Sequence, residues 1–379
     1  MRNLVCVIFL LLGSAFYANA QKAFPYECGG VAESLNAYWY VVPIDSVAWQ
    51  KNSSTSYFYS VAHVYGKVPE GDFSVSVKAF DSNNIFFTRE IQVSEDKASN
   101  ADAVYLAANG NFRIEFPVNT GLKRPDKIEI ELKSKEGNYK KTVSCVYHTI
   151  SGRITDFDGN PFKGFFRAAP DDFPNSISVW ADNEGYYNIT LPERSYNTYY
   201  SDDHTYGMSS LEYWGWRMIV DRDETIDIAI GNGEVYNLHA WSSNGGYSTF
   251  FLYFRPMVLP KALLPEEKYT SAINIGANSY NNINIAPELS EKDITVKVNG
   301  EKLDIISLQP VYETGRGSDG NFSMNAYLVQ VERPKSSWGR KLTFTLSYDT
   351  YITVNGEKVR VNSMGNCQLY TNITGLSEY

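Results

Sequence analysis

The chain is poor in the side chains that most often carry catalysis or bind metal ions. Only four cysteines and four histidines occur among 379 residues. No Cys-x-x-Cys, His-Glu-x-x-His or Gly-x-Ser-x-Gly motif is present, which excludes zinc-binding cysteine pairs, zincin-type metallopeptidases and the nucleophile elbow of α/β-hydrolases. We therefore predict a protein that is not an enzyme and that holds no metal and no other cofactor.

Charge is also scarce. Charged residues make up 20 % of the chain, and the net charge is −9 at pH 7. The sequence has no basic patch with interleaved aromatic residues, so we predict that nucleic acid is not a partner. A moderate acidic excess mainly keeps a protein soluble.

Long hydrophobic runs are absent except near the N-terminus. A positive charge at Arg2 precedes the apolar run 4–12, and a small-x-small sequence ends at Ala20. This is the pattern of a secretory signal peptide, residues 1–20, cleaved near Ala20-Gln21. No later run approaches the ~18 apolar residues that a membrane-spanning helix needs. We predict a protein without a membrane-spanning segment that is secreted, periplasmic or held at the cell surface.

Aromatic residues are abundant, with 28 Tyr and 20 Phe. Together with frequent Asn and Gly they favour strands and tight turns over helices. Short alternating runs separated by turn clusters recur along the whole chain. We therefore predict an all-β fold with three consecutive β-sandwich domains, in residues 21–147, 148–232 and 233–379.

The first of these domains has the pattern of an immunoglobulin-like sandwich. Phe73, Val75 and Val77 alternate with polar residues, which predicts a strand with one buried and one solvated face. About seven such strands are separated by clusters such as Pro69-Glu70-Gly71. The prediction concerns architecture alone, because the Cys-Trp-Cys arrangement of true immunoglobulin domains is not evident.

The middle third carries a recognisable pattern. Residues 150–156 (ISGRITD) are followed by the turn 158–161 (DGNP), and 181–187 (ADNEGYY) come later. These sequences resemble the opening strand, first turn and later hairpin of the carboxypeptidase regulatory-like (transthyretin-like) domain. The resemblance is dense over 150–191 and implies an accessory β-sandwich in residues 148–232, with no catalytic half.

Two positions in that pattern have a physical reason. Gly159 and Gly185 stand where the backbone φ must become positive. The nearby Asp156 and Asp158 lack the spacing and the closing Glu of an EF-hand, so we predict an Asx turn here and not a calcium loop.

The last third contains two strong hairpin signals. Asn299-Gly300 and Asn355-Gly356 each separate alternating strands, which predicts type I′ turns with positive φ at both residues. A further hairpin is expected around Asn244-Gly245-Gly246. We predict another immunoglobulin-like sandwich.

The segment between Pro192 and Trp216 departs from the family pattern, and we predict a long aromatic loop there. Long loops in compact domains are often functional. Aromatic faces stack on sugar rings or pack on protein partners, and neighbouring carboxylates bind hydroxyl groups. The candidate ligand-binding residues are Tyr196, Tyr199, Tyr200, Asp202, Asp203, Tyr206, Tyr213 and Trp214. The alternative, favoured for Trp216, is that these side chains fill a core.

Cys28 and Cys145 lie near the two ends of the first predicted domain, where the first and last strands of a sandwich can meet. A secreted protein can form disulfides, so a Cys28–Cys145 bond is one expectation. The other is that Cys28, Cys145 and Cys367 all remain buried thiols, which behave as small apolar side chains.

These observations favour a secreted or cell-envelope binding protein that recognises a glycan or a cell-surface partner through the aromatic loop. The alternative is an accessory or assembly protein that engages other proteins through sandwich edges. An enzyme with an unrecognised site is a third class. Exposure separates the first two. A solvent-facing row beside carboxylates favours glycan, and this row would consist of Tyr199, Tyr200, Tyr206 and Trp214. An exposed, flat strand edge without such a groove favours protein.

Overall fold

The structure is a computed structural model, and it describes residues 30–41, 60–94, 104–106, 110–118, 123–170, 176–203, 205–242, 249–318, 320–334 and 341–370. These residues are mostly β-strand, so the predicted all-β fold is confirmed. The helical elements are short: α2 (Val31–Ser34), α4 (Leu259–Ala262), and the 3-10 helices η4 (Glu266–Lys268) and η5 (Glu291–Asp293). In the described part of the chain, no helix has the length and hydrophobicity to cross a membrane.

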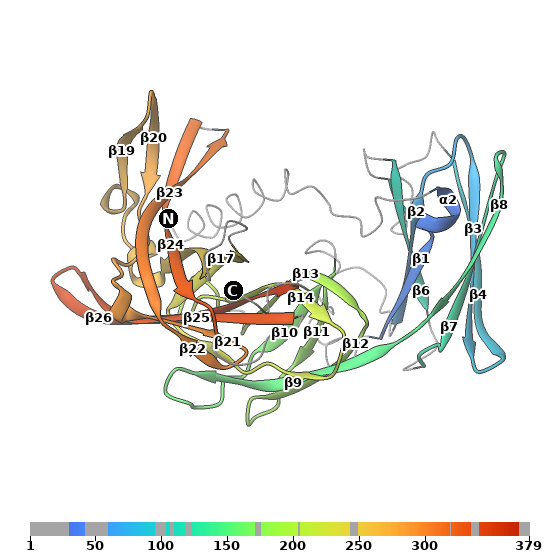
Figure 1. The fold of residues 1–379 in the computed structure, drawn as a ribbon, viewed down its shortest axis with the longest axis horizontal. Helices are drawn as coiled ribbons and strands as arrows, with labels where there is room; N and C mark the ends of the chain where they lie inside the picture. Colours follow the sequence, from blue (N-terminus) through green and yellow to red (C-terminus); the bar gives the residue numbers. More distant parts are fainter. Residues whose placement is uncertain are drawn as a thin grey trace.

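The first part of the chain forms two four-stranded sheets packed face to face (Figure 1). One sheet has, in spatial order, β1 (Asn36–Val41), β2 (Ser60–Lys67), β6 (Asn111–Val118) and β5 (Val104–Leu106). The other has β4 (Asn84–Val93), β3 (Phe73–Asp81), β7 (Lys127–Ser134) and β8 (Gly137–Ser144). Alternation places Ile128, Ile130 and Leu132 of β7 in a core with Trp39 and Phe112, because apolar side chains of period two share one face.

The second sandwich is built around β9 (Tyr147–Asp156). It pairs antiparallel with β12 (Tyr186–Pro192) and parallel with the short strands β15 (Glu224–Thr225) and β16 (Ile228–Ile230). The facing sheet has the order β11 (Ile177–Trp180), β10 (Phe165–Ala169), β13 (Arg194–Asp202) and β14 (Tyr213–Val220). The two sheets enclose a core in which the Phe166 and Tyr187 rings stack with centroids 4.7 Å apart.

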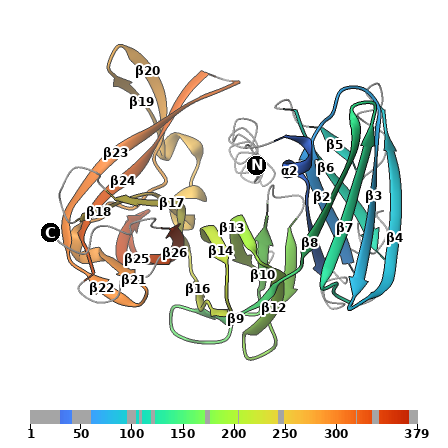
Figure 2. The ribbon, with the colours of Figure 1, turned by 45° about the vertical axis from the view of Figure 1, so that its right-hand side comes forward.

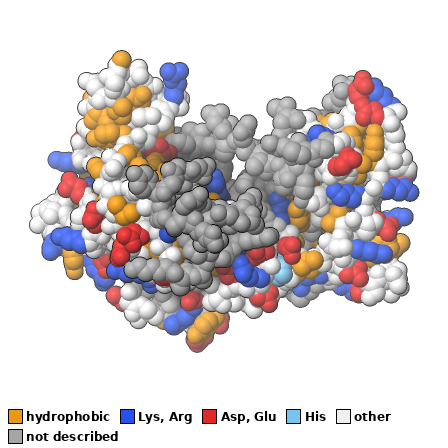
Figure 3. All heavy atoms as spheres, viewed as in Figure 1, with side chains coloured by type: hydrophobic (Ala, Val, Ile, Leu, Met, Phe, Trp, Pro, Cys, Tyr) orange, Lys and Arg blue, Asp and Glu red, His pale blue; other side chains and the backbone are white. Residues whose placement is uncertain are grey.

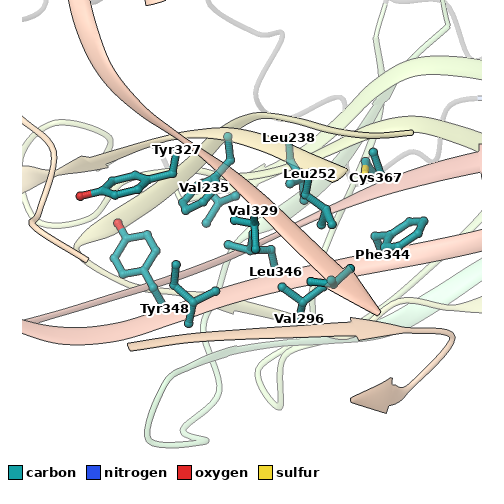
Figure 4. Close-up of a cluster of buried hydrophobic side chains, with 14 of the residues drawn as sticks. Val235, Leu238, Leu252, Val296, Tyr327, Val329, Phe344, Leu346, Tyr348 and Cys367 are labelled. Atoms are coloured by element: carbon teal, nitrogen blue, oxygen red, sulfur yellow. The ribbon is translucent and has the colours of Figure 1, made fainter. Parts of the chain in front are cut away.

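The third sandwich has the strand order β17 (Gly233–Ser242), β18 (Thr249–Val258), β24 (Gly320–Glu332), β20 (Asn278–Ile283) and β19 (Thr270–Ile275), and β23 (Ile305–Gly317) also pairs with β24. The facing strands are β26 (Glu357–Tyr370), β25 (Lys341–Val354), β21 (Ile294–Val298) and β22 (Glu301–Leu303). Figure 4 shows the core between them, where Leu252 and Val329 face Phe344 and Leu346.

One sheet joins the second and third sandwiches. β14 pairs in parallel with β26, with Trp214 opposite Gly365 and Trp216 opposite Cys367. The result is one eight-stranded sheet that runs from β11 through β14 and β26 to β22 (Figures 1 and 2). Backbone pairing therefore connects these two sandwiches. The domain boundaries at 147/148 and 232/233 stay predictions.

The first and second sandwiches contact each other through an arginine and several tyrosines. Arg194 of β13 donates from Nη1 to the hydroxyls of Tyr40 (2.6 Å) and Tyr65 (3.1 Å). Its guanidinium carbon lies 4.3 Å from the centroid of the Tyr38 ring. Tyr40 packs into the core of the second sandwich. A charged group that is hydrogen-bonded and covered by rings in this way holds the two units against each other.

The predicted type I′ hairpins are present. Asn299 and Gly300 have φ angles of 48° and 87°, and Asn355 and Gly356 have 52° and 86°. The strands that flank them pair directly, β21 with β22 and β25 with β26. The strands on either side of Asn244-Gly245-Gly246, β17 and β18, also pair, although the turn itself lies outside the described residues.

The predicted Asx turn is also present. The Asp156 carboxylate accepts hydrogen bonds from the backbone N–H of Asp158 (2.9 Å) and Asn160 (2.8 Å). Gly159 and Gly185 have φ angles of 84° and 85°, as the turn pattern predicts. These local features of the family resemblance therefore form as expected.

Candidate functional site

The prediction of a long aromatic loop between Pro192 and Trp216 is wrong. Most of that segment forms the antiparallel strands β13 and β14, and only residues 203–212 connect them. A tyrosine-rich sequence favours strand where neighbouring strands are available to pair with it, and β10 and β26 supply those neighbours.

Strand geometry divides the candidate residues between two faces. Tyr196, Tyr199 and Tyr213 are at most 1 % exposed and belong to the core of the second sandwich. Gly215 makes room for this packing, because a Cβ there would lie 2.0 Å from the Tyr199 ring. Tyr200 and Trp214 form a separate cluster. The expected solvent-facing row is therefore absent among these residues.

The second cluster is a continuous set of rings in contact, which we call the aromatic row: Trp180, Phe165, Tyr200, Trp214, Trp216 and Tyr236. It crosses β11, β10, β13 and β14 and ends at β17. Phe165 meets the rings of Trp180 and Tyr200 edge-on, with interplanar angles of 76° and 88°. The Tyr200 and Trp214 rings lie 5.1 Å apart with an interplanar angle of 22°, and Trp214 and Trp216 lie 5.4 Å apart at 18°. Tyr236 meets Trp214 edge-on at 5.4 Å. Trp216 also packs against the third core, so the row connects the two sandwiches.

Two arginines flank the aromatic row. The guanidinium of Arg167 lies 4.7 Å from the Phe165 ring and hydrogen-bonds to the Tyr200 hydroxyl. Arg255 of β18 lies 4.6 Å from the Tyr236 ring and 3.2 Å from the carboxylate of Glu313. Stacked, nearly buried guanidinium groups are stabilised by the ring faces.

Three carboxyl groups, Asp202, Glu212 and Glu234, lie near the same rings. Burial, followed by the charge of Asp202, raises the pKa of Glu212 to about 8. Burial, followed by the charge of Glu212, raises the pKa of Glu234 well above its usual value, although Arg255 acts in the opposite direction. Burial therefore disfavours the charged form of both carboxyl groups.

The remaining candidates lie on the connection between β13 and β14. Asp203 accepts hydrogen bonds from the backbone N–H (2.8 Å) and the hydroxyl (2.5 Å) of Thr205. Tyr206 is half-buried and packs beside Leu211 and Met257. Asp203 therefore stabilises a turn, and Tyr206 contributes to packing.

The described residues offer little space for a small ligand. Within them, no group of three or more His, Cys, Asp and Glu side chains has the geometry to hold a metal ion. A cavity of about 90 Å³ lies where β1 and β9 meet Glu193, and an open, shallow depression of about 290 Å³ lies beside Phe73 and Lys133. Small-molecule sites usually occupy about 300–1,000 Å³. In the aromatic row, Phe165, Tyr200 and Trp214 are at most 5 % exposed, whereas the other three rings are half-buried.

The predicted disulfide falls partly outside the described residues, because Cys28 is not among them. Cys145 is half-buried and has no disulfide partner among the described residues. Burial raises the pKa of its thiol to about 11. The Cys28–Cys145 bond stays a prediction.

Sequence reasoning missed several members of the cluster. Phe165, Arg167 and Trp180 lie on β10 and β11, which precede the aromatic segment in the sequence. Glu234 and Tyr236 lie on β17 of the third sandwich. The only local signal was the alternation Trp214-Gly215-Trp216, which places two tryptophans on one face of a strand.

No protein-family model matches the chain, and no curated protein matches it. Among solved structures it is similar to a DUF3823 family protein from Bacteroides ovatus, with 10% identity, a TM-score of 0.19, and coverage of 59% of this chain and 99% of the other. Domains D2 and D3 of the major pilin SpaD from Corynebacterium diphtheriae have 7% identity, a TM-score of 0.20, and coverage of 52% and 98%. The major pilin subunit BcpA of Bacillus cereus has 9% identity, a TM-score of 0.18, and coverage of 59% and 69%.

Scores this low establish no relationship in fold or function. The resemblance to the carboxypeptidase regulatory-like domain is accordingly not confirmed. The stacked antiparallel sheets are compatible with an immunoglobulin-like architecture.

Proposed function

We propose that the protein is a secreted or cell-envelope binding protein without a catalytic role, and that it engages another protein at a surface or in an assembly. Exposed sheet edges make the contact. This is the class in which a partner strand adds to a sheet through main-chain hydrogen bonds, and alternate side chains supply specificity.

The observation that carries this proposal is a set of strands at the edges of the sheets. Within the described residues, β4, β8, β19 and β23 each pair with a neighbour along one side only. Many of their residues are exposed. The unpaired side of such a strand presents N–H and C=O groups that another chain can bind.

Burial of the candidate aromatic residues supports the same choice. A glycan site needs ring faces that sugar can reach, and Tyr199 and Tyr213 are at most 1 % exposed. The criterion of exposure therefore favours a protein partner over a glycan.

Glycan recognition is the second candidate, and one observation favours it. The rings of Tyr200, Trp214 and Trp216 stack nearly parallel, with Arg167 and Asp202 on neighbouring strands. Stacked rings beside polar groups suit the apolar and hydroxylated faces of a sugar. This function requires the face of the row to open.

Binding of the labelled mature protein to cells of the producing strain that lack the gene tests the proposal. We expect binding that protease treatment of the cells abolishes and that periodate oxidation of surface glycans leaves intact. A glycan array should be silent. A Trp216→Ala variant, which shortens the aromatic row, should bind as well as the unaltered protein.

The opposite pattern would replace the proposal with the glycan function. That pattern is periodate-sensitive binding, a positive array and loss of both in Trp216→Ala. Equal unfolding temperatures of the variant and the parent protein would show that the loss is not a folding defect.

A further inference from the structure

Residues 205–212, which lead from β13 to β14, form a short strap that packs against the third sandwich. The N–H of Leu211 donates to the carbonyl of Gly231 (3.0 Å). The Leu211 side chain is 0 % exposed and belongs to a cluster with Met257 of β18. The tip of the strap reaches solvent, because Met208 is 63 % exposed. The third sandwich therefore holds the strap at Leu211, close to its end.

The strap ends at Glu212, which lies near the buried Glu234 of β17. Glu234 is 1 % exposed, and its Oε2 has no hydrogen-bond partner in the part of the chain that the structure describes. The Glu234 backbone is held in place, because its N–H donates to the hydroxyl of Tyr348 (3.2 Å). An unpaired oxygen in such a site costs far less free energy on a neutral carboxyl group than on a carboxylate.

The groups around this pair contain more acid than base. Among the described residues, the charged side chains are two guanidinium and four carboxyl groups: Arg167, Arg255, Asp202, Glu212, Glu234 and Glu313. The neighbouring tyrosines are Tyr200, Tyr206, Tyr236 and Tyr348, and burial raises the pKa of each, so they stay neutral. Full ionisation of the carboxyl groups would exceed the two guanidinium charges by two.

Acidic side chains at the surface have a different environment. On the face drawn in Figure 3, they lie among Lys and Arg side chains and reach solvent. Water stabilises a carboxylate there, so its charge costs little. Glu234 lies out of reach of water, where a carboxylate needs a cation or loses its charge by binding a proton. The described acidic, His and Cys side chains form no group that could hold a metal ion, so a proton is the cation that fits.

We propose that Glu212 and Glu234 form a proton-controlled latch: the strap stays docked on the third sandwich while they hold protons, and their ionisation releases residues 205–212. Ionisation places negative charge on both sides of the contact between the strap and β17. Repulsion between like charges is strong where water is excluded, and it opposes docking. This movement lies within the chain and needs no partner, so it is separate from the proposed function.

The direction of the pH response follows from the two carboxyl groups. Burial, followed by the charge of Asp202, raises the pKa of Glu212 from 4.5 to about 8. Burial also raises the pKa of Glu234 well above its usual value. Such groups stabilise the docked strap fully below the pKa of the released state, and the contribution is lost as the pH rises through the docked-state pKa. The strap should therefore be held most firmly near about pH 5 and most weakly at about pH 9.

Hydrogen exchange of the Leu211 amide in the full mature protein tests the latch. This N–H is bonded to Gly231 only while the strap is docked, so its exchange reports release. Glu234→Gln keeps the size of the side chain but cannot ionise. We expect its Leu211 amide to exchange about tenfold more slowly than that of the parent at about pH 9, and equally fast at about pH 5. Comparison at equal pH cancels the intrinsic pH dependence of exchange.

Two controls show that the effect is local. Glu332→Gln removes the same charge from an exposed position at the end of β24, and it should leave the exchange of Leu211 at the parent's rate. The amide of Leu252, in the core of the third sandwich, should exchange much more slowly than Leu211 at about pH 9. Equal rates for Leu211 and Leu252 in the parent would mean that the strap opens only when the sandwich unfolds, and would overturn the latch.

A second variant covers the case in which Glu234→Gln does not fold. Glu212 is half-buried, so Glu212→Gln disturbs less packing, and it should slow the exchange of Leu211 at about pH 9 in the same way. Unchanged or faster exchange of Leu211 in every folded glutamine variant of the pair would overturn the proposal.

Discussion

The aromatic segment Arg194–Val220 and the hairpin Thr270–Ile283 are both pairs of strands, but their surroundings differ completely. The first is crowded with tyrosine and tryptophan and lies inside an eight-stranded sheet. The second has a single tyrosine and no charged residue, and it ends a sheet in solvent. The aromatic segment, whose composition is typical of a binding site, is therefore buried, whereas the hairpin Thr270–Ile283 lies at the surface.

The cause of the difference is the number of neighbours. β13 and β14 have strands on both sides, and their faces are covered by two separate clusters of side chains. β19 has a neighbour on one side only. Aromatic side chains stabilise a sheet most where both faces are covered, so a high aromatic content is better evidence for burial than for ligand binding.

Of the changes considered, substitution of a core tyrosine should lower the free energy of unfolding most. Tyr199 is 0 % exposed and packs against the rings of Phe166 (5.5 Å) and Tyr213 (6.0 Å). Tyr199→Ala should lower the free energy of unfolding by about 3–5 kcal/mol, measured by urea denaturation. The control Tyr186→Ala, at a side chain that is 57 % exposed, should change it by less than about 1 kcal/mol. A loss of less than about 1 kcal/mol for Tyr199→Ala would show that the Tyr199 side chain is not part of the core.

The next largest effect on the free energy of unfolding is expected at the turn of the hairpin Thr270–Ile283. Gly276 has a φ of 60°, in the region that side chains with a Cβ avoid. Gly276→Ala should cost about 1–2 kcal/mol in thermal or urea unfolding. Gly317→Ala, in the neighbouring hairpin, is the control because this residue has no positive φ and its new Cβ meets only ordinary contacts at 3.7 Å. Equal effects of the two would mean that the turn is not strained.

The pH dependence of stability tests the buried glutamates beside the aromatic row. The pKa of Glu212 is raised from 4.5 to about 8, so its contribution is full below pH 4.5 and is lost as the pH rises to about 8. The unfolded chain releases this proton first, and unfolding is favoured over that window. Because Glu212 is only half-buried, we expect a loss on the order of 1 kcal/mol.

Glu212→Gln isolates this contribution. The variant should lose less stability across the same pH window than the parent, since the amide does not titrate. Glu234 acts in the same direction and remains in the variant. Identical pH profiles for variant and parent would exclude Glu212 as the source.

The smallest effect on the free energy of unfolding is expected in β19, which has a paired strand on one side only. Ala272 is exposed and its N–H faces away from the hairpin. Ala272→Lys should change the free energy of unfolding by no more than about 0.5 kcal/mol in dilute solution. A larger loss would show that Ala272 contributes to internal packing, and the contrast with Tyr199 would weaken.

Local patterns predicted much of the fold. Alternation located β3, and Asn-Gly located the turns before β22 and β26, because period-two burial and positive φ act over a few residues. The same rules failed between Pro192 and Trp216. Whether tyrosines there formed a loop or a strand depended on β26, whose residues lie near the far end of the chain.

The candidate site was predicted in part. Tyr200, Asp202 and Trp214 do lie near one another, whereas Tyr199 and Tyr213 point to the opposite face. Adjacent residues of a strand face opposite sides of the sheet, so consecutive aromatic residues in one strand are distributed over both faces. Arg255 and Glu234 joined the cluster only because two sandwiches meet there.

The sequence by itself determined the all-β class, the turns and the alternating faces, since these depend on residues close together along the chain. The tertiary structure alone decided that β14 pairs with β26, that the aromatic residues are enclosed and that β19 is left at an edge. Pairing between distant strands is a choice among many competing neighbours, and no local pattern encodes which strand has two neighbours and which has one.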